Sequence, residues 1–161
     1  MRNEIIENFG GVLRVRVCGI LLDSQGLLMV CHQGVTDKGD FWSPPGGGMR
    51  FGQSAADCLK QEFLEETGLE IAVGELLLVN EFHGTPFHAL ELFFMVKRTG
   101  GKLVTGYDPE LTPDQQIIKE VRYFKTDDFQ RYSGAQLHAV LRNIRAPEQV
   151  LNLKGYFHNS K

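Results

Sequence analysis

The sequence predicts a single α+β domain, because strand-like and helix-like patterns follow one another along a chain of 161 residues. Residues 12–22 and 27–33 are apolar stretches of strand length. Residues 54–67 have the start signal, stop signal and apolar spacing of a helix. A chain of this length buries one sizeable core rather than two. We therefore take residues 1–161 as one domain.

The first two strands are expected to form a hairpin. Residues 12–22 are rich in β-branched side chains, residues 24–26 (Ser-Gln-Gly) have turn composition, and residues 27–33 follow as the second strand. Arg14 and Arg16 fall on one face of the first strand. From there they can either reach a substrate phosphate or simply face solvent.

A glycine-rich loop separates these strands from the helix. Residues 34–40 are polar and predict a loop, and residues 41–43 predict a short strand. Gly46, Gly47 and Gly48 then allow the backbone to approach an ion or a phosphate closely. Three glycines alone are weak evidence for such a site.

The helix has recognisable ends. Ser54 and Asp57 have the spacing of a capping box, and Gly68 is a natural C-cap. Ala55, Leu59 and Phe63 lie on one side and supply its apolar face. The sequence therefore predicts a helix that begins just after Ser54 and ends just before Gly68.

Three glutamates gather on another face of this helix. Glu62, Glu65 and Glu66 stand at positions i, i+3 and i+4, so their like charges repel within one turn. A bound cation or full solvation relieves that repulsion. Mg²⁺ prefers hard oxygen ligands and is often shared between protein carboxylates and substrate phosphates. Next to a glycine loop, this pattern predicts a magnesium site for phosphoanhydride hydrolysis.

The rest of the chain adds strands and a second helical region. The expected elements are strands at 70–81 and 87–98 around a turn at 83–86, a polar loop at 105–116, a buried strand at 121–124 and a helical region at 127–144.

One longer pattern resembles a known family. Residues 47–69 read Gly47-x5-Gln53-x7-Gln61-Glu62-Phe63-x-Glu65-Glu66-x-Gly68-Leu69. This string is similar to the Nudix box, G-x5-E-x7-R-E-U-x-E-E-x-G-U, where U is a bulky apolar residue, and the spacing is kept throughout. A match of this length is specific, whereas a lone E-x-x-E-E would indicate only a solvated helix face.

The resemblance implies the Nudix fold, a mixed β-sheet sandwiched between α-helices. It also implies a Mg²⁺- or Mn²⁺-dependent hydrolase of nucleoside diphosphate derivatives. By position, Glu62, Glu65 and Glu66 would be the catalytic residues that bind the metals, with the Gly47 carbonyl as a further ligand. Glu62 can instead act mainly as the general base. Family members place this base either in the box helix or in a later loop.

A later acidic residue completes the metal site in many family members. Glu120, just before the strand at 121–124, is the first candidate, with Asp114 and Glu110 behind it. Each of them can equally be a surface charge.

Two positions depart from the family pattern. Gln53 replaces a glutamate and Gln61 replaces an arginine, so both partners of an expected supporting ion pair are neutral. Two amides can still hydrogen-bond to each other, and the paired loss leaves no unpaired charge. We therefore predict a Gln53–Gln61 contact that preserves the loop and holds the metals somewhat more weakly.

The candidates for binding the substrate phosphates are Arg14, Arg16, Gly46 and Gly48. The substrate itself stays open between ADP-ribose or an ADP-sugar, for which Pro86 is a mild hint, and a modified nucleoside triphosphate. A turn explains Pro86 equally well. The alternative function is a non-catalytic Nudix-fold module that binds a nucleotide or sugar phosphate.

Composition narrows the partners and the compartment. The net charge of −3 gives no nucleic-acid footprint, and no apolar run approaches the length of a membrane span. Cys18, Cys31 and Cys58 form no C-x-x-C pair and are expected to be reduced core thiols. We therefore expect a soluble cytoplasmic protein with no nucleic-acid or membrane partner. The family resemblance makes a homodimer plausible, and the sequence does not decide it.

Overall fold

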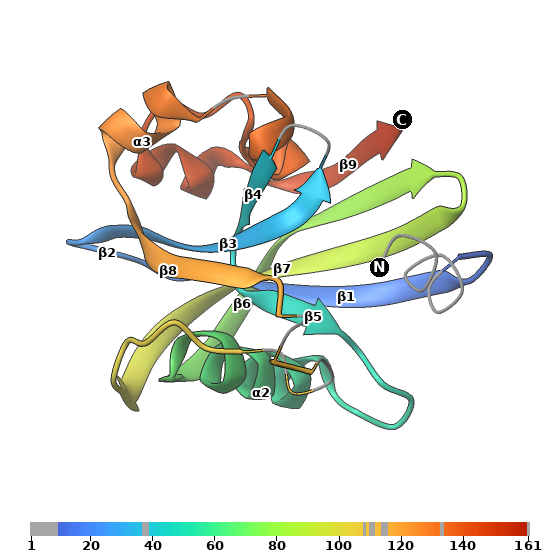
Figure 1. Ribbon diagram of the computed structural model, residues 1–161, viewed down its shortest axis with the longest axis horizontal. Coiled ribbons are helices and arrows are strands. Elements are labelled where there is room, and N and C mark those ends of the chain that lie inside the picture. Colours follow the sequence, from blue (N-terminus) through green and yellow to red (C-terminus); the bar gives the residue numbers. More distant parts are fainter. Residues whose placement is uncertain are drawn as a thin grey trace.

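The computed structural model describes residues 10–36, 39–107, 109, 112–113, 116–132 and 134–160. Within these ranges, strands form two sheets that lie between helix α2 on one side and helix α3 with short 3₁₀ turns on the other (Figure 1). The strands are β1 (Leu13–Ile20), β2 (Leu22–Asp23), β3 (Gly26–Thr36), β4 (Gly39–Ser43), β5 (Gly46–Gly48), β6 (Leu69–Gly84), β7 (Phe87–Gly101), β8 (Ile118–Phe124) and β9 (Gly155–Ser160). The helices are α2 (Ala55–Thr67) and α3 (Thr126–Arg131), and the 3₁₀ turns are η2 (Gly134–Gln136), η3 (Ala139–Leu141) and η4 (Pro147–Asn152). The predicted α+β class with a mixed sheet between helices is confirmed.

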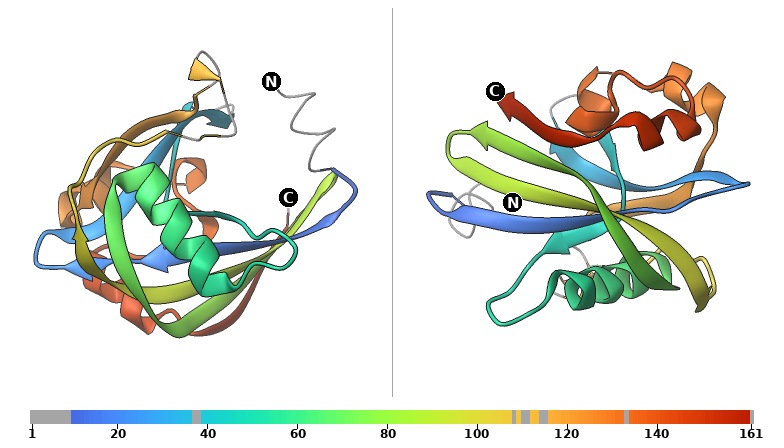
Figure 2. Two further views of the ribbon diagram at one scale, coloured as in Figure 1. Left: turned by 90° about the horizontal axis from the view of Figure 1, so that it is seen from below. Right: turned by 180° about the vertical axis from the view of Figure 1, so that it is seen from behind.

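The larger sheet has the strand order β5-β1-β7-β6-β9. β1 runs parallel to β7, and β9 runs parallel to β6, while the other neighbours are antiparallel. This sheet places β5, which carries the three glycines, directly beside β1, which carries the two arginines. Figure 2 shows the long β6–β7 ribbon twisting across the molecule behind α2.

The second sheet is built on β3, which pairs with β2, β4 and β8. β3 is buried on both faces, since Met29 and Cys31 pack in one core cluster and Leu28 and Val30 in another. The first cluster lies under α3 and the 3₁₀ turns, and the second lies against α2. A strand covered on both faces has no polar alternation, which explains the continuous apolar run of its sequence.

The expected hairpin of residues 12–22 and 27–33 is wrong over most of its length. Only β2 pairs with the start of β3, around a turn at residues 24–25, whereas β1 belongs to the other sheet. The reason is that β1 finds its partners in β5 and in β7, which comes much later in the chain. Two neighbouring apolar strands therefore diverge into different sheets.

Helix α2 has the predicted ends. The Ser54 hydroxyl accepts a hydrogen bond from the Asp57 N–H at 3.1 Å. Gly68 adopts the left-handed conformation, with φ of 71°, and its N–H donates to the Leu64 carbonyl. Leu59 and Phe63 are fully buried against the sheets. Local signals thus define both ends of the helix that carries the three glutamates.

The expected continuous helical region at 127–144 is wrong beyond its first turns. α3 ends at Arg131, and the chain continues through the separate turns η2 and η3. Gly134 adopts a φ of 56°, in the left-handed region, which is incompatible with helix continuation. The sequence reading also missed η4 and the final strand β9.

The predicted loops and the predicted cysteine environment had different outcomes. Residues 34–36 and 39–40 extend β3 and β4, so the loop expected at 34–40 is wrong for them. The loop expected at 105–116 is irregular at residues 105–107, and its candidates Glu110 and Asp114 lie outside the described residues. The three cysteines are free and buried, as predicted.

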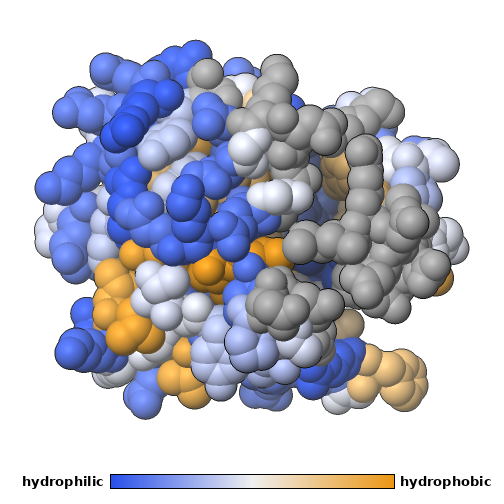
Figure 3. All heavy atoms as spheres, viewed as in Figure 1, coloured by the Kyte–Doolittle hydropathy of each residue, from blue (hydrophilic) through white to orange (hydrophobic). Residues whose placement is uncertain are grey.

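Two further observations concern possible membrane helices and the hydropathy of one face of the molecule. Within the described part of the chain, no helix is long and apolar enough to cross a membrane. The face in Figure 3 is largely hydrophilic in its upper half, and its hydrophobic surface gathers in the lower half of the view.

Candidate active site

The candidate site lies where β5 meets α2. β5 pairs with β1 in antiparallel register, with Gly48 opposite Arg16 and Gly47 opposite Val17. The loop after β5 leads directly into the Ser54 cap of α2. The short path from β5 to α2 therefore holds the glycine loop against the helix face that carries the glutamates.

Glu66 is tied to the glycine strand. Its Oε2 accepts a hydrogen bond from the Gly46 N–H at 2.9 Å. Its Oε1 lies 3.7 Å from His32 Nε2 on β3, and only 7% of the residue is exposed. A buried carboxylate needs such partners, and here they come from both sheets.

Glu62 lies against the next glycine of the same strand. A Cβ on Gly47 would overlap the carboxyl carbon and Oε1 of Glu62, and it would lie 2.5 Å from Oε2. A side chain at position 47 would therefore displace this carboxylate. The same closeness places the backbone of Gly47 beside the carboxylate, as the expected shared metal site requires.

Glu65 is held by the two glutamines. Gln53 Nε2 donates to Gln61 Oε1 at 3.0 Å, and Gln61 Nε2 donates to Glu65 Oε1 at 2.8 Å. Gln53 Oε1 in turn accepts from the Arg50 N–H at 3.3 Å. The predicted Gln53–Gln61 contact is therefore present. It continues as a neutral chain of hydrogen bonds from the loop to Glu65.

The three carboxylates offer the hard oxygen donors that Mg²⁺ and Mn²⁺ prefer. Among the described residues, no three histidine, cysteine, aspartate or glutamate side chains converge closely enough to form a ready-made metal group. Each of the three instead keeps its own neighbour: Gly47 for Glu62, Gln61 for Glu65 and Gly46 for Glu66. The donor set fits a divalent cation by its chemistry, and binding would require the carboxylates to turn toward a common point.

Glu120 does not join these glutamates. Its Oε1 lies 3.1 Å from Arg122 Nε, and its side chain is about half exposed. Side chains alternate along a strand, and its neighbour Val121 packs in the core cluster that includes α2. Arg122 lies on the opposite face, over the ring of Trp42 at 4.9 Å. The expected metal role of Glu120 is therefore not supported by its position, because β8 points this side chain away from α2.

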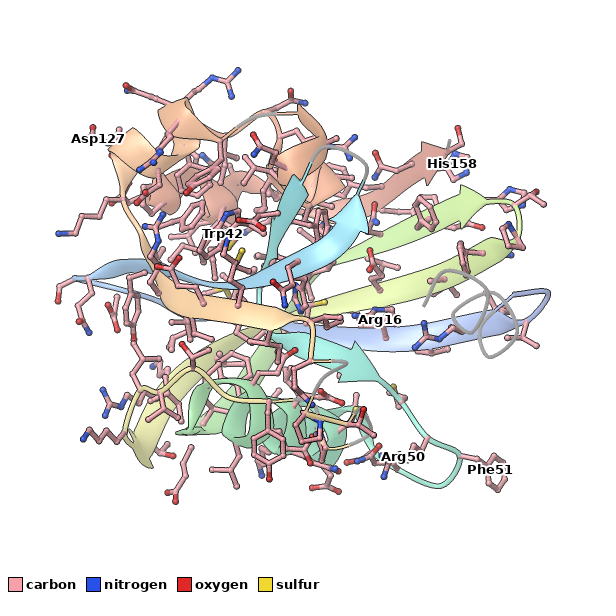
Figure 4. The ribbon with its side chains drawn as sticks, viewed as in Figure 1. Arg16, Trp42, Arg50, Phe51, Asp127 and His158 are labelled. Carbon is pink, nitrogen blue, oxygen red and sulfur yellow. The ribbon has the colours of Figure 1, made fainter. Side chains whose placement is uncertain are left out.

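The two arginines of β1 lie beside the glycine strand. The Arg14 guanidinium would be 2.9 Å from a Cβ on Gly48, and Arg16 stands opposite Gly48 in the register. Both line a cavity of about 200 Å³. Its lining consists of Arg14, Arg16, Phe82, Phe87, His88, Ala89 and Glu91. In Figure 4, Arg16 lies on β1 in the middle of the molecule, whereas Phe51 projects outward from the loop before α2.

Sequence reasoning missed a buried polar group at the wall of this cavity. Glu91 on β7 is 8% exposed and lies 3.7 Å from Arg16 Nε, measured from Oε1. Its Oε2 lies 2.9 Å from His138 Nε2 and accepts a hydrogen bond from Asn80 Nδ2 at 2.8 Å. Burial raises the pKa of Glu91, but His138, Arg16 and Asn80 outweigh it and lower the pKa to about 2. A signal existed, since Glu91 interrupts the apolar run of residues 89–96 and Asn80 directly follows the apolar run of residues 76–79.

The sequence was also compared with models of known protein families. A family model for the NUDIX domain matches residues 12–143, which span most of the sequence. The chain belongs to the Nudix family. The Nudix box is therefore the segment described above as β5, the loop and α2, and the protein is an enzyme of the hydrolase class that acts on phosphoanhydride bonds.

Solved structures agree with this Nudix fold. The chain is similar to an ADP-ribose pyrophosphatase from Streptococcus suis, with 16% identity, a TM-score of 0.58, and coverage of 89% of this chain and 98% of the other. It is also similar to a UDP-X diphosphatase, with 19% identity, a TM-score of 0.62, and coverage of 99% and 75%. A MutT protein from Methanosarcina mazei has 16% identity, a TM-score of 0.64, and coverage of 81% and 88%. No curated protein sequence matches the chain.

Proposed function

We propose that this Nudix enzyme hydrolyses the diphosphate bond of a nucleoside diphosphate derivative with Mg²⁺, or with Mn²⁺ in its place. The observation that carries the proposal is that Glu62 and Glu66 lie against the glycine strand, with Glu65 on the same helix held by Gln61 and with Arg16 opposite that strand. Carboxylates for cations and a guanidinium for phosphate are the groups that such a reaction needs.

The glutamates and the Gly47 carbonyl would hold the cations. Divalent cations there would neutralise and align the diphosphate and increase the acidity of the attacking water. Glu62 is the candidate general base, since it is the box carboxylate closest to the Gly47 backbone. Arg14 and Arg16 would bind the phosphate oxygens from the β1 side, and Gly46 and Gly48 would let the phosphates approach the backbone.

Two kinds of substrate follow from the solved relatives. One relative is an ADP-ribose pyrophosphatase and another is a UDP-X diphosphatase, so nucleoside diphosphates linked to a sugar come first. Phe82 and Phe87 in the wall of the arginine-lined cavity offer aromatic surface to a base or sugar. A modified nucleoside triphosphate is the second kind, in keeping with the MutT relative.

The test is a hydrolysis screen with product identification. The panel holds ADP-ribose, UDP-sugars and normal and oxidised nucleoside triphosphates, each with Mg²⁺, with Mn²⁺ and with EDTA. We expect metal-dependent release of a nucleoside monophosphate from at least one sugar-linked compound, and a loss of at least about 100-fold in Glu65→Gln. Nucleotide binding without turnover of any compound would contradict hydrolysis and favour a binding module.

A further inference from the structure

The strongest unassigned feature is the buried group around Glu91, which four separate segments of the chain build. Glu91 comes from β7, Arg16 from β1, Asn80 from β6 and His138 from the segment between η2 and η3. Asn159 of β9 adds a fifth segment, because its Nδ2 donates to Asn80 Oδ1. The group thus ties the C-terminal part of the chain to the strand that carries the arginines.

Each oxygen of Glu91 has a distinct partner. Oε2 is shared by His138 Nε2 and Asn80 Nδ2, at 2.9 and 2.8 Å, and these contacts fix the carboxylate. Oε1 is left facing Arg16, where it lies 3.7 Å from Nε. Nε is the nitrogen nearest the side-chain stem, and a guanidinium carries two further amino groups that donate in a fixed fork. An anchor at Nε therefore orients the fork without consuming it.

Arg16 has Glu91 opposite it on β7, and on its other side it has β5, against which Glu62 and Glu66 lie. Burial lowers the pKa of Arg16, but Cys18 and the carboxylates of Glu91, Glu66 and Glu62 outweigh burial and raise it. Opposite charges attract strongly where water is scarce, so without Glu91 the guanidinium would turn toward the box glutamates. There it would compete with the cations that those glutamates are proposed to hold. The position of Glu91, one strand farther from β5 than Arg16, opposes that movement.

We propose that Glu91 is a positioning residue for the substrate diphosphate: it holds Arg16 away from the box glutamates and aims its amino groups at the phosphates. His138, Asn80 and Asn159 fix Glu91 in turn. This inference rests on the proposed function, because that function identifies the anion that Arg16 binds as a diphosphate.

The test is a double-mutant cycle on binding of inorganic pyrophosphate to the full chain, measured by calorimetry without added metal. The variants are Glu91→Gln, Arg16→Ala and the two combined. We expect Glu91→Gln and Arg16→Ala each to raise the Kd about tenfold, the loss of one charge-assisted hydrogen bond. The combined variant should be no weaker than Arg16→Ala alone, because Glu91 acts through Arg16.

Glu75→Gln is the control. Glu75 lies in the same sheet, at an exposed position of β6 outside the lining of the arginine-lined cavity. It loses one carboxylate charge, as Glu91→Gln does, and its Kd should stay within twofold of the wild type. Thermal unfolding of all variants separates binding from folding. If Glu91→Gln does not fold, His138→Gln replaces it in the cycle with the same expectation.

The outcomes are distinct. A merely structural role would lower the melting temperature of Glu91→Gln while leaving its pyrophosphate Kd within twofold of the wild type, and that result overturns the proposal. Additive effects in the combined variant overturn it as well. The double-mutant cycle measures pyrophosphate binding and not hydrolysis. Its result can therefore be read even if the hydrolysis screen finds no substrate. In an active enzyme, Glu91→Gln should raise KM more than it lowers kcat.

Discussion

Replacement of Gly47 by alanine tests the placement of Glu62 most sharply. The added Cβ would lie 2.5 Å from Glu62 Oε2 and closer to the rest of the carboxyl group, whereas ordinary contact begins at 3.4 Å. The carboxylate must therefore move by about 1 Å, and a displacement of that size can cost about 100-fold in rate. Overpacking of this kind typically costs about 1–3 kcal/mol of stability. We expect kcat to fall about 100-fold while the protein still folds.

The assay is steady-state hydrolysis of the best compound from the screen, with thermal unfolding measured in parallel. Gly100→Ala is the control, because its Cβ would lie 2.7 Å from Oε2 of Glu70, an exposed glutamate outside the site that can swing into solvent. Its kcat should stay within twofold of the wild type. A folded Gly47→Ala enzyme with unchanged kcat would refute the reasoning that the Gly47 backbone and the Glu62 carboxylate form one site.

Two further predictions concern the box carboxylates and their supports, and a third concerns Glu91 on β7. Gln61→Leu removes the hydrogen bonds to Gln53 and Glu65, at about 1 kcal/mol each. The Mg²⁺ concentration that gives half-maximal activity should therefore rise several-fold. An unchanged Mg²⁺ titration would contradict the role of Gln61 in supporting Glu65. Glu66→Gln keeps an acceptor for the Gly46 N–H but removes the negative charge. The variant should stay folded, and its kcat at saturating Mg²⁺ should fall at least about tenfold. Full activity of this variant would exclude Glu66 from the metal site. The paired charges and hydrogen bonds around Glu91 outweigh burial and lower its pKa from 4.5 to about 2. The ionised Glu91 therefore stabilises the folded protein by at most about 3 kcal/mol. This stabilisation is complete above pH 4.5 and is lost as the pH falls toward 2. The urea midpoint of the wild type should therefore drop more steeply between pH 5 and pH 3 than that of Glu91→Gln, and parallel curves would contradict the assignment.

Features with local causes were predictable from the sequence. The ends of α2 depend on Ser54 and Gly68, whose side chain and backbone act on the adjacent turn. The Gln53–Gln61 contact was equally accessible, because both residues lie within one pattern of fixed spacing. The helix and its glutamates could therefore be placed before any strand pairing was known.

Features that depend on distant pairing were not predictable in this way. β1 and β3 are neighbours in the sequence, but β1 pairs with β7 and β3 pairs with β8, so the hairpin expectation failed. The direction of Glu120 depends on the register of β8, which shifts between Cys31 and His32 of its partner strand. A single sequence carries no signal for such a shift.

The group around Glu91 shows the same limit for the site. A polar residue within an apolar strand was visible in the sequence, but its partners His138 and Asn159 come from the C-terminal part of the chain. That part was expected to be a helical region at 127–144, and nothing was predicted after it. Only the observed turns and β9 bring these side chains to the larger sheet.

Direct titration with Mn²⁺, followed by electron paramagnetic resonance of the free ion, tests the central claim that the box glutamates bind divalent cations. The wild type should bind Mn²⁺, and Glu65→Gln combined with Glu66→Gln should weaken that binding at least about tenfold by replacing two of the three carboxylate ligands with neutral amides. Glu75→Gln, at an exposed position on β6, should bind as the wild type does. Equal Mn²⁺ affinity in the wild type and the double variant would contradict the account.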